Sequence, residues 1–176
     1  FFSFFCLLPL LLPAKIGLPY DSIGLHPQRI SIFNTWQEKE ILHLALKAPL
    51  STLFAEKNKK SSYQSASLII DAKSKTAYET PVSVKVRGKF RRRICDFPPL
   101  KIKLQEKEVN GIEVGNYKTF KLVTHCSDDI PTNEYLLKEH LIYNLYEQLS
   151  EHSFRTQLVK ITYVDEDQQR AKVKRY

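Results

Sequence analysis

The chain has 176 residues, of which 43% are hydrophobic and 26% are charged. A chain of this length can bury a substantial core, and this composition excludes a protein that is mainly disordered. The net charge of +8 favours anionic partners over cationic ones, namely phosphate, nucleic acid, anionic lipid or acidic glycan. The alternative is that the positive charge serves solubility alone.

The first 17 residues are typical of a secretory signal. Residues 1–13 carry no charge, and this run is too short for a bilayer core of roughly 30 Å, which needs about 20 residues. We therefore expect export to a periplasm, a cell envelope or the medium, and no transmembrane span beyond the signal. Residues 18–37 follow as a lead-in segment without hydrophobic periodicity. Because the chain starts with Phe1 and contains no Met, we expect it to be a piece of a longer protein, truncated at both ends.

The cysteine count agrees with export. If Cys6 is removed with the signal, Cys95 and Cys126 remain as an even pair. In an oxidising compartment they could form a disulfide that closes a loop of about 30 residues and stabilises the fold by about 3–4 kcal/mol. The alternative, two unrelated buried thiols, stays open.

The first predicted elements are a strand, a short helix and a β-hairpin. Residues 40–47 alternate in polarity, with their leucines on the side expected to face the core. Residues 51–57 fit a short helix with Ser51 as its N-cap. Residues 66–71 and 80–88, joined by a polar turn, are expected to form the hairpin.

Two alternating strands lie within residues 82–104. Their Val, Leu and Ile side chains share one face, and antiparallel pairing would bring four cations together on the other. These are Lys85, Arg87, Lys101 and Lys103. This second face is either an anion-binding surface or the ordinary solvent side of a half-covered sheet.

The two strands are joined by the basic sequence RGKFRRR, residues 87–93. It could bind the phosphates of nucleic acid, with Phe90 available for stacking, although an exported protein rarely meets nucleic acid. It could instead be a phosphate-binding turn in which Gly88 lets the backbone approach the ligand, or a solvated basic turn.

A polar connection, residues 106–116, carries Asn110-Gly111 as its turn signal, and residues 118–126 form a third alternating strand. A final strand is predicted over residues 154–164. With the helix described next, these elements predict an α+β fold. We expect a twisted, mainly antiparallel sheet of about five or six strands with one long helix packed on it.

The clearest helix covers residues 134–149, with start signals near Thr132 or Asn133. Its apolar stripe consists of Leu137, Leu141, Ile142, Leu145, Tyr146 and Leu149. The opposite polar face consists of His140, Asn144 and Glu147. Glu139 lies on the shoulder of the apolar stripe, where a partly dehydrated carboxylate should need a cationic or hydrogen-bond-donating partner.

The sequence carries no motif for metal binding or nucleophilic catalysis. His125 and Cys126 are adjacent on a predicted strand, so their side chains point to opposite faces and do not readily share one ion. There is no C-x-x-C, H-x-x-x-H or G-x-S-x-G spacing. The acidic pairs Asp128-Asp129 and Asp165/Asp167 are interpreted as carboxylates of surface turns.

Four segments, taken in order, resemble one protein family: VKVRGKFRRRICDFPPLKIKL, KTFKLVTHC, EYLLKEHLIYNLYEQL and FRTQLVKITYV. They are similar to the amino-terminal part of the CotH family, the atypical kinases of the spore-coat-protein-H type, in an exported bacterial branch. The resemblance covers residues 38–176 and implies the amino-terminal lobe of a kinase-like fold. Members that act as kinases transfer phosphate from ATP to protein hydroxyls with a divalent metal such as Mg²⁺ or Mn²⁺.

The resemblance also implies candidate nucleotide-binding residues. Protein kinases pair a strand lysine with a carboxylate on the neighbouring helix, and this pair holds the nucleotide phosphates. Here Lys121 and Glu139 are the candidate pair, Lys101 is the second candidate lysine, and Arg87 would also face phosphate. The catalytic base and the metal-binding acids are expected beyond Tyr176, so residues 38–176 alone, as an incomplete domain, should not catalyse phosphate transfer.

A second hypothesis is a non-catalytic envelope or surface protein. Its basic sheet face would bind a polyanion or a protein partner rather than a nucleotide. The two hypotheses differ in one measurable property, because only the first requires the full-length protein to bind ATP.

Overall fold

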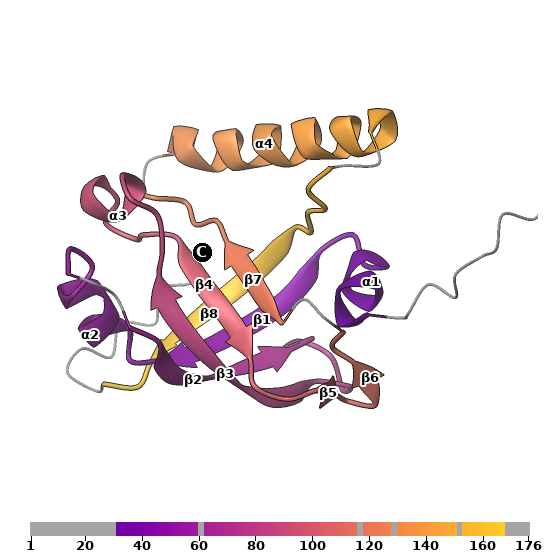
Figure 1. Cartoon of the computed structure of the whole chain (residues 1–176), viewed down its shortest axis with the longest axis horizontal. Coiled ribbons are helices and arrows are strands. Elements are labelled where there is room, and N and C mark those ends of the chain that lie inside the picture. Colours follow the sequence, from indigo (N-terminus) through magenta and orange to yellow (C-terminus); the bar gives the residue numbers. More distant parts are fainter. Residues whose placement is uncertain (1–30, 60–61, 116–117, 128–129, 151–152, 168–176) are drawn as a thin grey trace, which may run out of the picture.

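The computed structural model describes residues 31–59, 62–115, 118–127, 130–150 and 153–167. Its main feature is a six-stranded sheet that curls into a half-barrel, in the order β7-β4-β3-β2-β1-β8 (Figure 1). The strands are β1 (Leu42–Ala48), β2 (Gln64–Ile70), β3 (Tyr78–Val86), β4 (Leu100–Leu104), β7 (Thr119–Leu122) and β8 (Val159–Asp165). The predicted α+β class is confirmed, while the predicted signal at residues 1–17 lies outside the described residues.

The sheet is mixed rather than wholly antiparallel. From β7 to β1 each neighbouring pair runs antiparallel, as expected, but β8 runs parallel to β1 at the edge. Between β7 and β8 the chain passes through the long helix α4 (Ile130–Leu149), and these two strands occupy opposite edges of the sheet. A connection of this length can deliver the last strand in either direction, whereas a short hairpin turn enforces antiparallel pairing.

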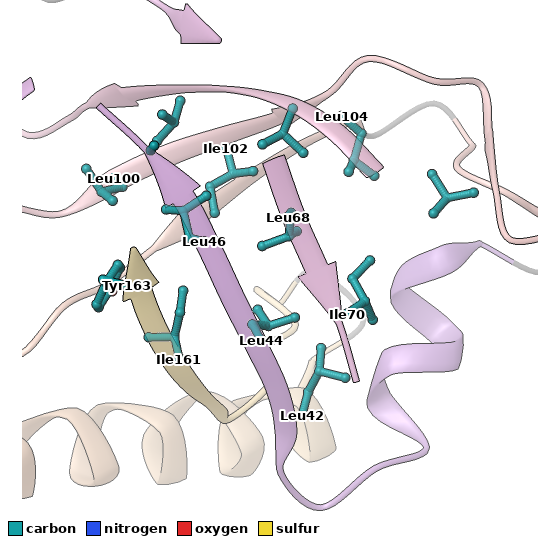
Figure 2. Packing of buried hydrophobic residues seen from close by; sticks show 14 of the residues in the cluster. Leu42, Leu44, Leu46, Leu68, Ile70, Leu100, Ile102, Leu104, Ile161 and Tyr163 are labelled. Carbon is teal, nitrogen blue, oxygen red and sulfur yellow. The ribbon is translucent and has the colours of Figure 1, made fainter. Parts of the chain in front are cut away.

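The hydrophobic core fills the inside of the curl. Side chains from β1, β2, β4 and β8 converge there (Figure 2). The predicted alternation is confirmed, because the leucines of β1, the valines of β3 and the Leu/Ile residues of β4 are all buried. Two short helices, α1 (Ile32–Gln37) and α2 (Leu50–Ala55), contribute further apolar side chains. Helix α1 was not predicted, because residues 18–37 show no hydrophobic periodicity in the sequence.

The predicted Ser51 cap of helix α2 is wrong. Ser51 lies inside the helix, and Asp165 at the end of β8 supplies the cap from a distance in sequence. One carboxylate oxygen of Asp165 accepts hydrogen bonds from the backbone N–H of Leu50 at 3.0 Å and of Ser51 at 3.4 Å, and the other accepts from the Ser51 hydroxyl. This arrangement satisfies N–H groups that the first turn of a helix leaves without a partner.

The predicted turn at Asn110-Gly111 is confirmed. It joins β5 (Glu108–Val109) to β6 (Ile112–Glu113) in a separate two-stranded ribbon. Asn110 has φ of 52° and Gly111 has φ of 75°. Two successive positive φ values are typical of the tight hairpin turn that Asn-Gly favours.

The third predicted strand is shorter than expected. Strand β7 stops at Leu122, and Thr124 and His125 are both buried, so the two-residue alternation does not reach Cys126. Cys126 itself adopts a φ of 70°, and its carbonyl accepts a hydrogen bond from the Phe97 N–H at 3.1 Å.

Helix α4 stands above one end of the sheet (Figure 1) and begins at Ile130, slightly earlier than predicted. Its apolar stripe is exposed, contrary to the expectation that the helix packs on the sheet through that stripe. The polar face instead meets the segment leading into β8, because His140 Nδ1 lies 2.8 Å from Thr156 Oγ1. Glu147 lies 3.8 Å from Arg155 in the same contact. Within the described residues, no helix has the length and hydropathy needed to cross a membrane.

Candidate functional site

Three lysines stand in line across the sheet on the face opposite the core. Strand pairing sets Lys85 of β3 opposite Lys101 of β4, and Lys101 opposite Lys121 of β7. We refer to Lys85, Lys101 and Lys121 as the lysine row. Neighbouring strands lie about 4.8 Å apart, so the row places three positive charges within about 10 Å of backbone.

An aromatic ring flanks each end of the row. The ammonium group of Lys85 lies 4.5 Å from the ring centroid of Tyr63, and that of Lys121 lies 5.4 Å from the ring centroid of Phe154. Cation–π contacts of this kind hold a lysine stem over the ring while the ammonium group keeps its charge. Lys101, in the middle of the row, is half-buried between its two neighbours.

The lysine row lacks acidic partners within the described part of the chain. Ion pairs do form elsewhere on the same sheet, such as Lys47 with Glu79 at 3.0 Å, but none includes a member of the row. Like charges directly opposite each other destabilise a strand pair. The sheet therefore holds a concentration of positive charge that its own side chains do not neutralise.

Two further cations from the sequence analysis lie beside the row. Lys103 follows on β4 and faces Ser83, one step along from the Lys85–Lys101 pair. Arg87 follows β3 directly, and its backbone N–H donates to the Pro99 carbonyl at 2.8 Å. The predicted common face of Lys85, Arg87, Lys101 and Lys103 is therefore consistent with the observed register.

The structure does not bring Lys121 and Glu139 into an ion pair. Lys121 contacts Phe154, while Glu139 is half-buried on α4, and no ion pair of the described residues joins the two. Lys101 and Lys121, the two candidate lysines, do stand side by side across β4 and β7. The kinase-like lysine–carboxylate clamp is thus not formed in this conformation.

The basic turn is fixed next to the end of β7. It folds into the short helix α3 (Arg91–Ile94), and the following residue, Cys95, forms a disulfide with Cys126. Lys57 donates a hydrogen bond to the Cys95 carbonyl at 2.8 Å, and Arg91 donates to the Thr124 carbonyl at 3.4 Å. Arg91 therefore helps to hold this turn against the end of β7, whereas Lys89 and Arg93 of the same turn are exposed and can meet a ligand.

No metal site is found among the described residues, where no three His, Cys, Asp or Glu side chains come together. His125 is buried, and its ring lies 5.2 Å from that of Phe97. Phe97 also contacts the rings of Phe54 at 4.7 Å and Tyr163 at 4.4 Å. His125 therefore belongs to an aromatic cluster rather than to a site for an ion.

Asp165 has a structural role that the sequence pattern did not predict, since that pattern indicated only a surface turn. Burial raises the pKa of Asp165, but hydrogen bonds from the Ser51 hydroxyl and from the backbone N–H groups of Asp167, Ser51 and Leu50 outweigh it. The pKa therefore lies below the ordinary value of 3.8. Asp128-Asp129, the other acidic pair considered, lies outside the described residues.

Two residues at the lysine row were not predicted from the sequence. Tyr63 lies just before β2, and continuing the hairpin register by one residue would have set it beside Lys85. Phe154 has no comparable signal, because it follows a helix and reaches Lys121 only through the tertiary fold. Comparison of the chain with protein-family models, curated proteins and solved structures gives no significant match.

Proposed function

We propose that the outer face of the sheet binds anions and that the lysine row is the centre of this site. The observation that carries the proposal is the alignment of Lys85, Lys101 and Lys121 on three neighbouring strands without acidic partners in the described residues. Such an alignment weakens the sheet, so a structural role does not explain it. Phosphate or sulfate groups would neutralise the lysine row. Relief of the repulsion among the three lysines would then contribute to the free energy of binding.

The resemblance to CotH kinases supplies one identity for the anion, a nucleotide bound with Mg²⁺ or Mn²⁺ by the full-length protein. The order of elements supports this version, because β7 carries Lys121 and leads into the helix that carries Glu139. In a phosphotransferase, Lys121, Lys101 and Arg87 would hold the phosphates, and Glu139 would orient a lysine. The metal ligands and the catalytic base are not among these residues, and this version assigns them to other parts of the full-length protein.

A polymeric anion is the second identity, in an envelope or surface protein without catalytic activity. The absence of a Lys121–Glu139 ion pair among the described residues favours it, since a polyanion needs only the exposed cations. Nucleic acid is the less suitable polymer if the protein is exported. The Cys95–Cys126 disulfide supports export, because disulfides persist mainly in oxidising compartments.

Replacing the central lysine tests anion binding. Lys101→Gln should weaken retention on a heparin column and at the same time leave the fold slightly more stable, since it removes two like-charge contacts. Lys75→Gln is the matched control, because Lys75 is exposed on the turn between β2 and β3 and carries the same charge. If both variants lose retention equally, net charge alone explains binding and the lysine row is not a site.

Nucleotide binding separates the two identities. Under the phosphotransferase version, full-length protein binds ATP with Mg²⁺ or Mn²⁺, and Lys121→Ala and Glu139→Gln each weaken that binding. Under the polyanion version, ATP does not bind, and retention on heparin falls steeply as salt rises. ATP affinity that is unchanged in Lys121→Ala would remove this lysine from the nucleotide site.

A further inference from the structure

Two apolar side chains project into solvent from the most basic turn of the protein. Phe90 is 69% exposed and Ile94 is 58% exposed. Phe90 is the N-cap residue of α3 and Ile94 is the last residue of that helix, four positions later, a spacing that places side chains on the same side of a helix. Lys89 and Arg93 flank them and are exposed as well. We refer to Lys89, Phe90, Arg93 and Ile94 as the α3 tip.

The α3 tip is firmly held, so its exposure is built into the fold. The N–H of Arg93 donates to the Phe90 carbonyl at 2.9 Å, and the N–H of Cys95 donates to the Arg91 carbonyl at 2.8 Å. The Cys95–Cys126 disulfide then fixes the end of the turn to the end of β7. Figure 1 shows α3 at the margin of the molecule, beyond the end of the sheet.

The charge around the two apolar side chains selects the partner. Five cations occur within residues 87–93, and within the described residues none of them forms an ion pair with a carboxylate. We propose that the α3 tip docks the protein on an anionic lipid surface. Phe90 and Ile94 enter the boundary between headgroups and acyl chains, and Lys89 and Arg93 contact lipid phosphates.

An anionic membrane fits this tip better than a soluble polyanion does. A polyanion would neutralise the cations but would leave both apolar side chains in water. Single-stranded nucleic acid could stack a base on Phe90, but Ile94 has no planar face to stack on. An anionic lipid surface accommodates both the exposed apolar side chains and the cations beside them. The residues of this proposal are distinct from the lysine row.

The exposed stripe of α4 is a less suitable membrane contact. Its described charged residues include Glu134, Glu139 and Glu147 against the single cation Lys138, so it lacks the positive charge that attracts anionic lipid. Leu149, the most exposed member of that stripe at 84%, therefore offers a matched apolar control.

Vesicle binding tests the proposal with the full chain. The protein should bind phosphatidylcholine vesicles in which about a quarter of the lipid is phosphatidylglycerol, and bind pure phosphatidylcholine vesicles much more weakly. Phe90→Ser/Ile94→Ser should weaken binding to the anionic vesicles at least about tenfold, and Leu149→Ser should not. Residues 1–13 are present in every variant, so any membrane affinity of that apolar run cancels in the comparison.

A separate pair of double variants tests the contribution of charge to vesicle binding. Lys89→Gln/Arg93→Gln should weaken vesicle binding by about fivefold for each charge removed, and Lys73→Gln/Lys75→Gln on the distant turn should have a smaller effect. Retention of Phe90→Ser/Ile94→Ser on heparin should equal that of the unmodified protein, which separates this site from the lysine row.

A fluorescence reporter locates the contact. The chain has one tryptophan, Trp36, and it is buried, so Phe90→Trp adds an exposed indole. Its emission should shift to shorter wavelength with the anionic vesicles. The proposal is overturned if that emission does not shift, if the protein does not bind anionic vesicles, or if Leu149→Ser loses as much binding as Phe90→Ser/Ile94→Ser.

Discussion

Loss of the Cys95–Cys126 disulfide should destabilise the protein strongly, because the bridge joins positions 31 residues apart. In the chain-entropy description, a loop of this size removes about 12 cal/mol/K from the unfolded state, which corresponds to about 3.7 kcal/mol at 25 °C. A loss of this size should lower the melting temperature by roughly 7–15 °C in a chain of this length. Because the bridge also ties the basic turn to the end of β7, that turn should become more mobile relative to β7 when the bridge is lost.

Urea unfolding of Cys95→Ala/Cys126→Ala, compared with the unmodified protein under oxidising and reducing conditions, measures this effect. The reduced unmodified protein and the double variant should agree, since both lack the bridge and differ only by two buried or half-buried sulfur atoms. Mass analysis of non-reduced peptides should recover Cys95 and Cys126 in one linked species. Equal stability of the oxidised and reduced proteins would refute the reasoning, because the bridge would then be absent or would not constrain the unfolded chain.

Other substitutions test the core and the Asp165 cap. Leu46→Ala should cost about 2–5 kcal/mol of unfolding free energy, since Leu46 is fully buried, whereas Leu137→Ala on the exposed stripe of α4 should change it by less than about 0.5 kcal/mol. Equal costs would mean that α4 is packed in solution. Asp165→Ala should cost about 1–2 kcal/mol by removing the cap of α2. Because the folded pKa of Asp165 is depressed, its contribution is present above the ordinary pKa of 3.8 and is lost as the pH falls through the lower folded value. Unfolding followed between neutral pH and pH of about 2 should therefore show a weaker acid dependence in Asp165→Asn than in the control Asp96→Asn, and identical profiles would contradict the cap.

The sheet was predictable from the sequence where local pattern and burial coincide. Over residues 82–86 of β3 and throughout β4 every second residue is apolar, so alternation sets the buried face and places the lysines of both strands on the opposite face. The same logic gave the Asn110-Gly111 turn, because only a few residue types adopt successive positive φ values. In these places the sequence carries the structural information within a few neighbouring residues.

Features that depend on contacts distant in sequence were not predictable. The cap of α2 comes from Asp165, which lies more than a hundred residues after Ser51, and no local pattern in either segment predicts this contact. The parallel pairing of β8 with β1 likewise depends on the path of the chain after α4. Phe154 reaches the lysine row for the same reason.

Helix α4 shows the limit of reading burial from periodicity. Its leucine stripe predicts a packed face, yet in this structure those leucines face solvent and His140 and Asn144 face the protein. A hydrogen bond between His140 and Asn144 at 3.1 Å and the contact with Thr156 link this polar face to the segment before β8. Periodicity thus identified the helix correctly but not which of its faces meets the rest of the protein.

The most direct measurement for the lysine row is the salt dependence of polyphosphate binding. Lys85→Gln/Lys101→Gln/Lys121→Gln should weaken binding and reduce the slope of log affinity against log salt by about 2–3, since each neutralised phosphate contributes roughly 0.7–0.9. The control Lys73→Gln/Lys75→Gln/Lys107→Gln removes the same charge from exposed positions outside the row. The slope of log affinity against log salt in this control should stay close to that of the unmodified protein. Equal slopes in the two triple variants would contradict an anion site on this face of the sheet.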